Sequence, residues 1–134
     1  MIVSDSRETR SEIASLLSLI EVQIVEVSSG PQVRDQVAIH EPDLLISDMQ
    51  VGSMGGYAIV LDLHLEESGD RQDHTPVLLL LDRRPDVFLA RRSGAEGYIV
   101  KPITAIKLRK AVSALLEGKT FEDESLKPTQ TSTR

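Results

Sequence analysis

Short apolar runs alternate along the chain with longer stretches in which apolar residues recur at helical spacing. Each short run is bounded by polar or turn-forming residues, which is typical of β-strands. The run Val77–Leu81 contains no polar residue, and such runs indicate strands buried on both faces of a parallel sheet. The pattern predicts five strands, at residues 1–4, 22–27, 43–47, 77–81 and 97–100.

The stretches between these runs are predicted helices. In the first of them, Ile13 and Leu17 fall on one face, and Ser6 is a candidate N-cap. Thr104 is the candidate N-cap of the last helix, and Gly94 the candidate C-cap of the fourth. The predicted helices cover residues 7–19, 32–40, 57–67, 85–93 and 105–117.

Strand and helix alternate five times, which indicates an α/β fold. We expect a doubly wound parallel sheet with right-handed crossovers, helices on both faces and the strand order 2-1-3-4-5. Residues 1–118 form the predicted domain. Residues 119–134 are polar and lack periodicity, so they are expected to form a disordered tail.

Composition narrows the chemistry. Of the 134 residues, 3% are aromatic, so an aliphatic core is expected, and none is cysteine, which excludes disulfides, thiol catalysis and thiolate metal sites. The net charge of -6 argues against direct DNA binding. No apolar run approaches the roughly 18 residues of a membrane span. The sequence starts directly with a predicted strand, so no signal peptide is expected. We therefore expect a cytoplasmic protein without membrane association.

Three charged residues each follow directly on a predicted strand. Asp5 follows the first strand, Asp48 the third and Lys101 the fifth. The carboxyl ends of parallel strands share one edge of a sheet, and open α/β sheets hold their ligands there. Two carboxylates and an amine at one edge suit binding of a divalent cation and modification of a carboxylate by a phosphoryl group.

Asp5, Asp48, the segment Met-Gly-Gly at 54–56 and the pair Lys101-Pro102 occur in a characteristic order. In these features the chain resembles the receiver domain of bacterial response regulators, over about residues 1–116. The resemblance implies the flavodoxin-like, five-stranded fold of that family.

The resemblance also implies roles for individual residues. Asp48 would accept a phosphoryl group from a histidine kinase or a phosphotransfer protein. Asp5, Asp48 and the backbone carbonyl of Gln50 would bind Mg²⁺. Lys101 would contact the phosphoryl oxygens, and Pro102 would follow a cis peptide bond.

The chain departs from the family pattern in two places. Ser4 stands where receivers carry a second acid, so we expect weaker Mg²⁺ binding. Leu81 stands where the fourth strand of a receiver ends in Ser or Thr, and the next residue, Asp82, would repel a phosphoryl group. Tyr98 occupies the place of the switch aromatic, but Leu81 cannot supply the hydroxyl that normally pairs with it.

Each site residue has a second interpretation. Asp48 could cap a strand–loop junction, and Asp5 could cap the first helix. Lys101 could be an ordinary ion-pair partner of Asp48 that holds an unphosphorylated site together. Tyr98 could serve in packing rather than as a working switch.

Four arginines, Arg83, Arg84, Arg91 and Arg92, flank the predicted fourth helix. They form either a solvated helix surface or a docking face for an acidic partner. Arg83 or Arg84 could also replace the missing hydroxyl as a phosphoryl contact.

The remaining charged residues carry weaker signals. The histidines lack metal-ligand spacing and are expected on the surface, at His40, His64 and His74. The acidic clusters at 66–67 and 122–124 are expected to be solvated.

The first hypothesis is a stand-alone receiver in two-component phosphorelay signalling. It is not an enzyme beyond catalysing its own phosphorylation and dephosphorylation. With no output domain expected, it would signal by protein–protein contact through the surface of its fourth helix, fifth strand and fifth helix, as a monomer or weak homodimer. The alternative is a pseudo-receiver, a phosphorylation-independent interaction or scaffold protein, which Ser4 and Leu81 favour. A small flavin or nucleotide binder is disfavoured, because a phosphate-cradling loop and stacking aromatics are lacking.

Overall fold

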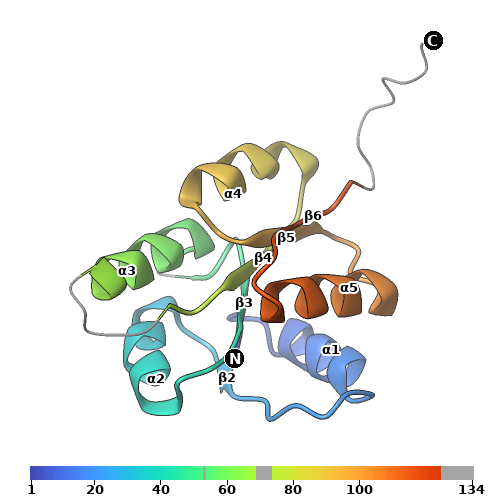
Figure 1. Ribbon diagram of the computed structural model, residues 1–134, viewed down its shortest axis with the longest axis horizontal. Coiled ribbons are helices and arrows are strands. Elements are labelled where there is room, and N and C mark those ends of the chain that lie inside the picture. Colours follow the sequence, from blue (N-terminus) through green and yellow to red (C-terminus); the bar gives the residue numbers. More distant parts are fainter. Residues whose placement is uncertain (53, 69–73, 125–134) are drawn as a thin grey trace.

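The computed structural model describes residues 1–52, 54–68 and 74–124. It contains one parallel sheet in the order β2-β1-β3-β4-β5-β6 (Figure 1). The doubly wound α/β fold is confirmed, with one strand more than the five predicted. The strands are β1 (Ile2–Val3), β2 (Glu26–Val27), β3 (Leu45–Asp48), β4 (Val77–Leu81), β5 (Gly97–Val100) and β6 (Phe121–Glu122).

Helices cover both faces of the sheet (Figure 1). One face packs against α1 (Arg7–Leu17) and α5 (Ala105–Leu116), and the other against α2 (Val33–His40), α3 (Gly56–Ser68) and α4 (Val87–Ser93). Each face has its own aliphatic cluster, and alternate residues of β4 contribute to the two clusters. All five residues of β4 are buried, as expected for a central strand covered on both faces.

The three predicted capping residues are confirmed. Ser6 Oγ accepts a hydrogen bond from the Thr9 N–H, and Thr104 Oγ1 accepts one from the Lys107 N–H. Gly94 ends α4 in the left-handed conformation, with φ of 86°. These local signals therefore set where α1, α4 and α5 begin or end.

Three predicted elements differ from the structure. β2 is confined to residues 26–27, because β1 offers it only Ile2 and Val3 as partners. The second and fourth helices are each preceded by a 3-10 turn, Gly30–Gln32 and Arg84–Asp86, in which a proline is an early residue.

β6 lies in the stretch that was expected to be a disordered tail. Residues 121–122 pair in parallel with residues 97–98 of β5, and Gly118, with φ of 80°, precedes this strand. Residues 119–124 therefore belong to the folded unit, and residues 125–134 lie outside the described residues. Within the described part of the chain, no helix is long and apolar enough to cross a membrane.

Candidate functional site

The candidate site lies at the carboxyl edge of the sheet, where β1, β3 and β5 end. Asp48 is the last residue of β3, and Lys101 follows directly on β5. Asp5 comes two residues after β1, which is the neighbour of β3. The parallel arrangement thus brings all three predicted charges to one edge of the sheet.

Asp48 is the centre of this site and is 5% exposed. Its Oδ2 accepts a hydrogen bond from Ser4 Oγ at 2.5 Å. Its Oδ1 is 2.9 Å from Lys101 Nζ and is buried, and the described residues give it no hydrogen bond beyond this ion pair. A buried carboxylate requires a positive charge nearby, and the Lys101 ammonium supplies it.

Lys101 is shared between two carboxylates. Its Nζ lies 2.9 Å from Asp48 Oδ1 and 2.9 Å from Asp82 Oδ1. Burial acts to lower the pKa of Lys101, but the hydrogen bonds and charges of Asp82 and Asp48 outweigh it and raise that pKa above its ordinary value. The ammonium therefore stays charged at neutral pH.

Asp5 is anchored to the loop after β3. Its Oδ2 accepts a hydrogen bond from the Gly52 N–H at 2.9 Å, and a Cβ on Gly52 would lie 3.3 Å from the same oxygen. Asp5 and Gln50 are both exposed. The described residues contain no cluster of three or more His, Cys, Asp or Glu side chains able to hold a metal.

Ser4 has a structural role that the sequence did not suggest. Its hydroxyl is fully buried, donates to Asp48 and accepts from the Ser6 N–H at 3.0 Å. The residue predicted to be a missing acid thus joins the start of α1 to the central carboxylate. Its position directly after the first strand was visible in the sequence, but its hydrogen bond was not.

The loop after β3 is shaped by glycine at the start of α3. A Cβ on Gly56 would lie 2.8 Å from the carbonyl oxygen of Asp48 and 2.8 Å from Leu79 Cδ2. The first turn of α3 can approach β3 this closely because residue 56 has no side chain.

Residues 1–113 match a family model described as the response regulator receiver domain. The chain belongs to this receiver domain family. Receivers act in two-component signalling, where they interact with histidine kinases and downstream partners, and they are signalling modules rather than classical enzymes.

Known response regulators are similar to this chain in sequence. It is 30% identical over 124 residues to the Regulator of RpoS of Escherichia coli K12, a match covering 90% of the chain and 35% of that protein. The chain thus spans about a third of the length of this relative. It is 31% identical over 124 residues to an uncharacterised response regulatory protein of Mycobacterium tuberculosis, covering 88% of the chain and 90% of that protein.

Two solved structures illustrate the similarity of fold. The signal receiver domain of a signal transduction histidine kinase from Syntrophus aciditrophicus is 30% identical, with a TM-score of 0.75. The match covers 99% of this chain and 95% of that one. The isolated REC domain of RcsB from Salmonella enterica serovar Typhimurium has the same TM-score at 20% identity, covering 92% and 91% of the two chains.

The two predicted switch positions, Leu81 and Tyr98, lie on the neighbouring strands β4 and β5. Leu81 is fully buried in the core, and Tyr98 is 3% exposed. The Tyr98 hydroxyl lies 3.4 Å from Glu122 Oε1 and 3.5 Å from Arg91 Nη2. Its polar partners thus come from β6 and α4 instead of β4.

Arg83 and Arg84 are directed to other partners in this receiver. Arg83 Nη2 pairs with Asp86 Oδ1 at 3.0 Å, and Arg84 Nη2 donates to the carbonyl oxygen of Asp123 at 2.7 Å. The structure brings Asp82, and neither arginine, to Lys101. The suggestion that an arginine replaces the missing hydroxyl therefore finds no support in these contacts.

One prediction about a charged residue was wrong. Asp123, expected to be solvated, is 2% exposed, and its Oδ2 accepts a hydrogen bond from the Val100 N–H at 2.9 Å. His74 is exposed on the surface, as expected, and its two ring nitrogens lie 2.9 Å from Glu67 Oε1 and 2.7 Å from Glu96 Oε2. No sequence signal paired these residues, because their partners are distant in the chain.

The pKa of His74 reflects this pairing. The hydrogen bond to Glu67 raises the pKa, burial lowers it, and the charge of Glu96 raises it, so the result lies above the ordinary value. The ring of His74 also stacks on that of His64, with centroids 6.4 Å apart.

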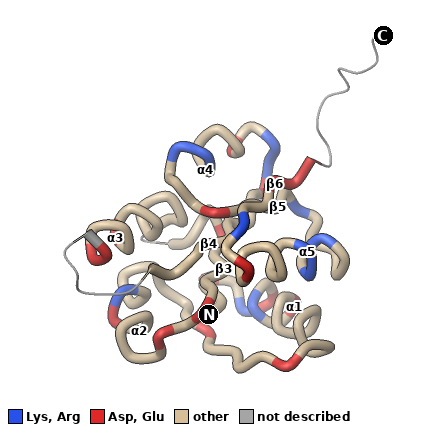
Figure 2. Tube along the Cα trace, viewed as in Figure 1, with Lys and Arg blue, Asp and Glu red and all other residues tan. Residues whose placement is uncertain are grey.

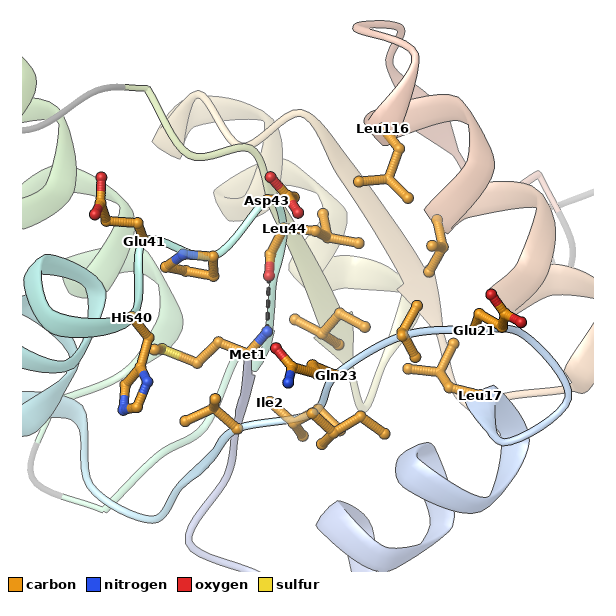
Figure 3. A pocket seen from close by; sticks show the side chains of 16 residues that line it. Met1, Ile2, Leu17, Glu21, Gln23, His40, Glu41, Asp43, Leu44 and Leu116 are labelled. Carbon is orange, nitrogen blue, oxygen red and sulfur yellow. Dashed lines mark hydrogen bonds between the residues drawn. The ribbon is translucent and has the colours of Figure 1, made fainter.

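A pocket of about 460 Å³ lies at the opposite edge of the sheet, where the strands begin (Figure 3). The amino group of Met1 points into it and donates to the carbonyl oxygen of Leu44 at 2.8 Å. Burial lowers the pKa of this amino group to about 6, with Asp43 acting in the other direction. None of the predicted site residues lines this pocket, so it is separate from the Asp48 site.

Proposed function

We propose that this chain is a phosphoryl-accepting receiver, in which Asp48 takes a phosphoryl group from a histidine kinase or a phosphotransfer protein. The observation that carries the proposal is the buried Asp48 carboxylate at the sheet edge, 2.9 Å from the Lys101 ammonium. The phosphorylated form would signal by protein–protein contact in the cytoplasm.

The chemistry needs a nucleophile and compensation of charge. A carboxylate oxygen of Asp48 forms a bond to phosphorus as the bond from phosphorus to the kinase histidine nitrogen breaks. The nitrogen keeps that electron pair and takes up a proton. Lys101 is held within ion-pair distance of the nucleophile, so its charge offsets that of the incoming phosphoryl oxygens. Such transfer depends mainly on positioning and electrostatics.

The donor set fits Mg²⁺, a cation that receivers generally bind. Carboxylate oxygens of Asp5 and Asp48 and the carbonyl oxygen of Gln50 would hold it, and all three are the hard oxygen ligands that Mg²⁺ prefers. The buried Oδ1 of Asp48, which makes no hydrogen bond with the described residues apart from its ion pair with Lys101, supports this fit. When bound, the ion would neutralise charge on the carboxylates and the phosphoryl group. Because Ser4 is uncharged, the site has one negative charge fewer than usual, and weak affinity is expected.

The proposal can be tested by intact mass spectrometry of the full chain incubated with Mg²⁺ and a small-molecule phosphodonor. We expect one added phosphoryl group that requires both Mg²⁺ and Asp48. The matched control is Asp48→Asn, which keeps the shape of the side chain and removes the nucleophile. Labelling that survives in Asp48→Asn would contradict the assignment of Asp48.

A second candidate function is a pseudo-receiver that binds partners without phosphorylation. It is favoured by the Asp82 carboxylate, which already occupies Lys101 at 2.9 Å, and by Leu81 in place of a hydroxyl. Absence of any adduct at high Mg²⁺, in a chain whose circular dichroism shows it folded, would favour this candidate. Partner binding that is unchanged in Asp48→Asn would point the same way.

A further inference from the structure

The last described residues of the chain lie along the outer edge of β5. Residues 121–122 pair in parallel with residues 97–98. The Phe121 N–H donates to the carbonyl oxygen of Glu96, the residue before β5, at 3.0 Å. Asp123 continues the pairing with its side chain, because its Oδ2 accepts the Val100 N–H at 2.9 Å. An extended segment of three residues thus covers this edge and ends on a buried carboxylate.

Three basic side chains contact this segment, and we call Arg84, Arg91 and Lys107 the basic cradle. Arg84 Nη2 donates to the Asp123 carbonyl at 2.7 Å, and Lys107 Nζ lies 3.1 Å from Asp123 Oδ2. Arg91 Nη2 lies 2.8 Å from Glu122 Oε1. The three come from the turn before α4, from α4 and from α5, and Figure 2 shows basic stretches of α4 and α5 around the acidic end of β6.

The basic cradle and the edge of β5 together suit an extended segment with acidic side chains. The segment pairs with β5 through its backbone. Its two consecutive carboxylates contact Arg91 and Lys107, and the Asp123 carbonyl oxygen accepts from Arg84. Addition of an extended peptide to an open strand edge is a common recognition mode, in which the backbone supplies affinity and side chains supply specificity. Two of the four arginines around α4, Arg84 and Arg91, thus contact an acidic segment of the same chain.

We infer that the β5 edge and the basic cradle form a binding site for an extended acidic segment, and that residues 121–123 are its intramolecular occupant. A partner segment with an aromatic residue followed by two acidic residues would fit the same site and displace the occupant. The site uses none of the residues around Asp48, so the inference does not rest on phosphorylation.

The occupant is suited to exchange. β6 has two residues, Phe121 is only partly buried, and the side chain of Glu122 is about half exposed. The side chain of Phe121 packs partly against the core, and backbone bonds and charged contacts hold the rest of the segment. A competing segment can reproduce all of these contacts.

The test is a binding titration of the full chain with a fluorescent peptide of the sequence Lys-Thr-Phe-Glu-Asp-Glu. Asp123→Asn weakens the intramolecular occupant, so the peptide is expected to bind this variant at least tenfold more tightly than the wild type. Glu122→Gln is expected to bind the peptide only about threefold more tightly than the wild type, because the contact between Glu122 and Arg91 is exposed and contributes little. Glu117→Gln changes an exposed acid outside the cradle and is expected to behave as the wild type.

A second peptide, with Gln and Asn in place of the acids that correspond to Glu122 and Asp123, is the matched control and is expected not to bind. The inference is wrong if both peptides bind Asp123→Asn equally, or if neither binds. If Asp123→Asn does not fold, the same comparison applies to Glu122→Gln. Hydrogen exchange of the wild type gives an independent check: the Phe121 amide should open more readily than the β4 amides. Equal protection of both would show a fixed strand and overturn the inference.

Discussion

At the scale of single residues, the site differs from one with a second acid because residue 4 is a serine. Its hydroxyl satisfies one oxygen of Asp48 in the buried interior. In Ser4→Asp a second carboxylate faces Asp48, so the free energy of unfolding without Mg²⁺ should fall by about 2 kcal/mol. The added charge should strengthen Mg²⁺ binding, and Mg²⁺ should therefore stabilise the variant more than the wild type.

Urea unfolding at several Mg²⁺ concentrations measures both effects. Ser11→Asp places the same charge on the exposed face of α1 and serves as the control. Equal responses of Ser4→Asp and Ser11→Asp to Mg²⁺ would show that residue 4 does not face the metal site.

Asp82 is the second residue that sets the charge of the site. It competes with Asp48 for the Lys101 ammonium, and its negative charge would oppose an arriving phosphoryl group. In Asp82→Asn, the rate of phosphorylation by a small phosphodonor should rise about three- to tenfold. The effect is limited to roughly 1 kcal/mol because Asp82 is half exposed and solvent screens its charge. Time courses of intact mass measure it, with the exposed Asp35→Asn as control. An unchanged or slower rate would mean that Asp82 does not restrain the site.

At the scale of elements, the approach of α3 to β3 depends on Gly56. A Cβ there would lie 2.8 Å from both the Asp48 carbonyl oxygen and Leu79 Cδ2, so Gly56→Ala must push α3 away from the strand. We expect the free energy of unfolding to fall by about 1–3 kcal/mol. Gly118→Ala is the comparison, because a Cβ at residue 118 would have no atom within 4 Å. Its expected cost is about 1 kcal/mol, which comes from the left-handed φ alone. Denaturant unfolding measures both, and a smaller loss for Gly56→Ala would show that α3 adjusts without strain.

Local signals predicted most elements well, and long-range pairing explains where they failed. β4 and β5 were predicted at their observed bounds, since each is a continuous apolar run between turn residues. β2 was predicted too long, because residues 22–25 are apolar enough for a strand but have no strand partner. β6 was missed, because its formation depends on partners in β5, α4 and α5 that periodicity does not reveal.

At the scale of the whole molecule, the position of the site followed from topology, but its hydrogen bonds did not. Any parallel sheet in the predicted order brings Asp48 and Lys101 to one edge, so their proximity could be anticipated. The donation from Ser4 to Asp48 and the sharing of Lys101 with Asp82 depend on side-chain directions at strand ends. A list of residue types at those positions cannot supply such directions.

The pH dependence of stability combines two groups with opposite signs. The pKa of His74 is raised, so its contribution is complete below its ordinary value of about 6.5 and is lost as the pH rises through the folded pKa. The pKa of the Met1 amino group is lowered from 8.0 to about 6, so the unfolded chain binds more protons between these values. Stability therefore rises with pH through this second window.

Replacing His74 separates the two contributions. The imidazole faces Glu67 and Glu96 and stacks on His64, so His74→Gln removes its charge from between the end of α3 and the start of β5. The stability difference between wild type and His74→Gln should be largest near pH 6 and should shrink toward pH 8. Thermal unfolding across that range measures it, with His40→Gln, exposed in the last turn of α2, as the control. A difference that is constant with pH would mean that the protonated imidazole adds nothing to the link between α3 and β5.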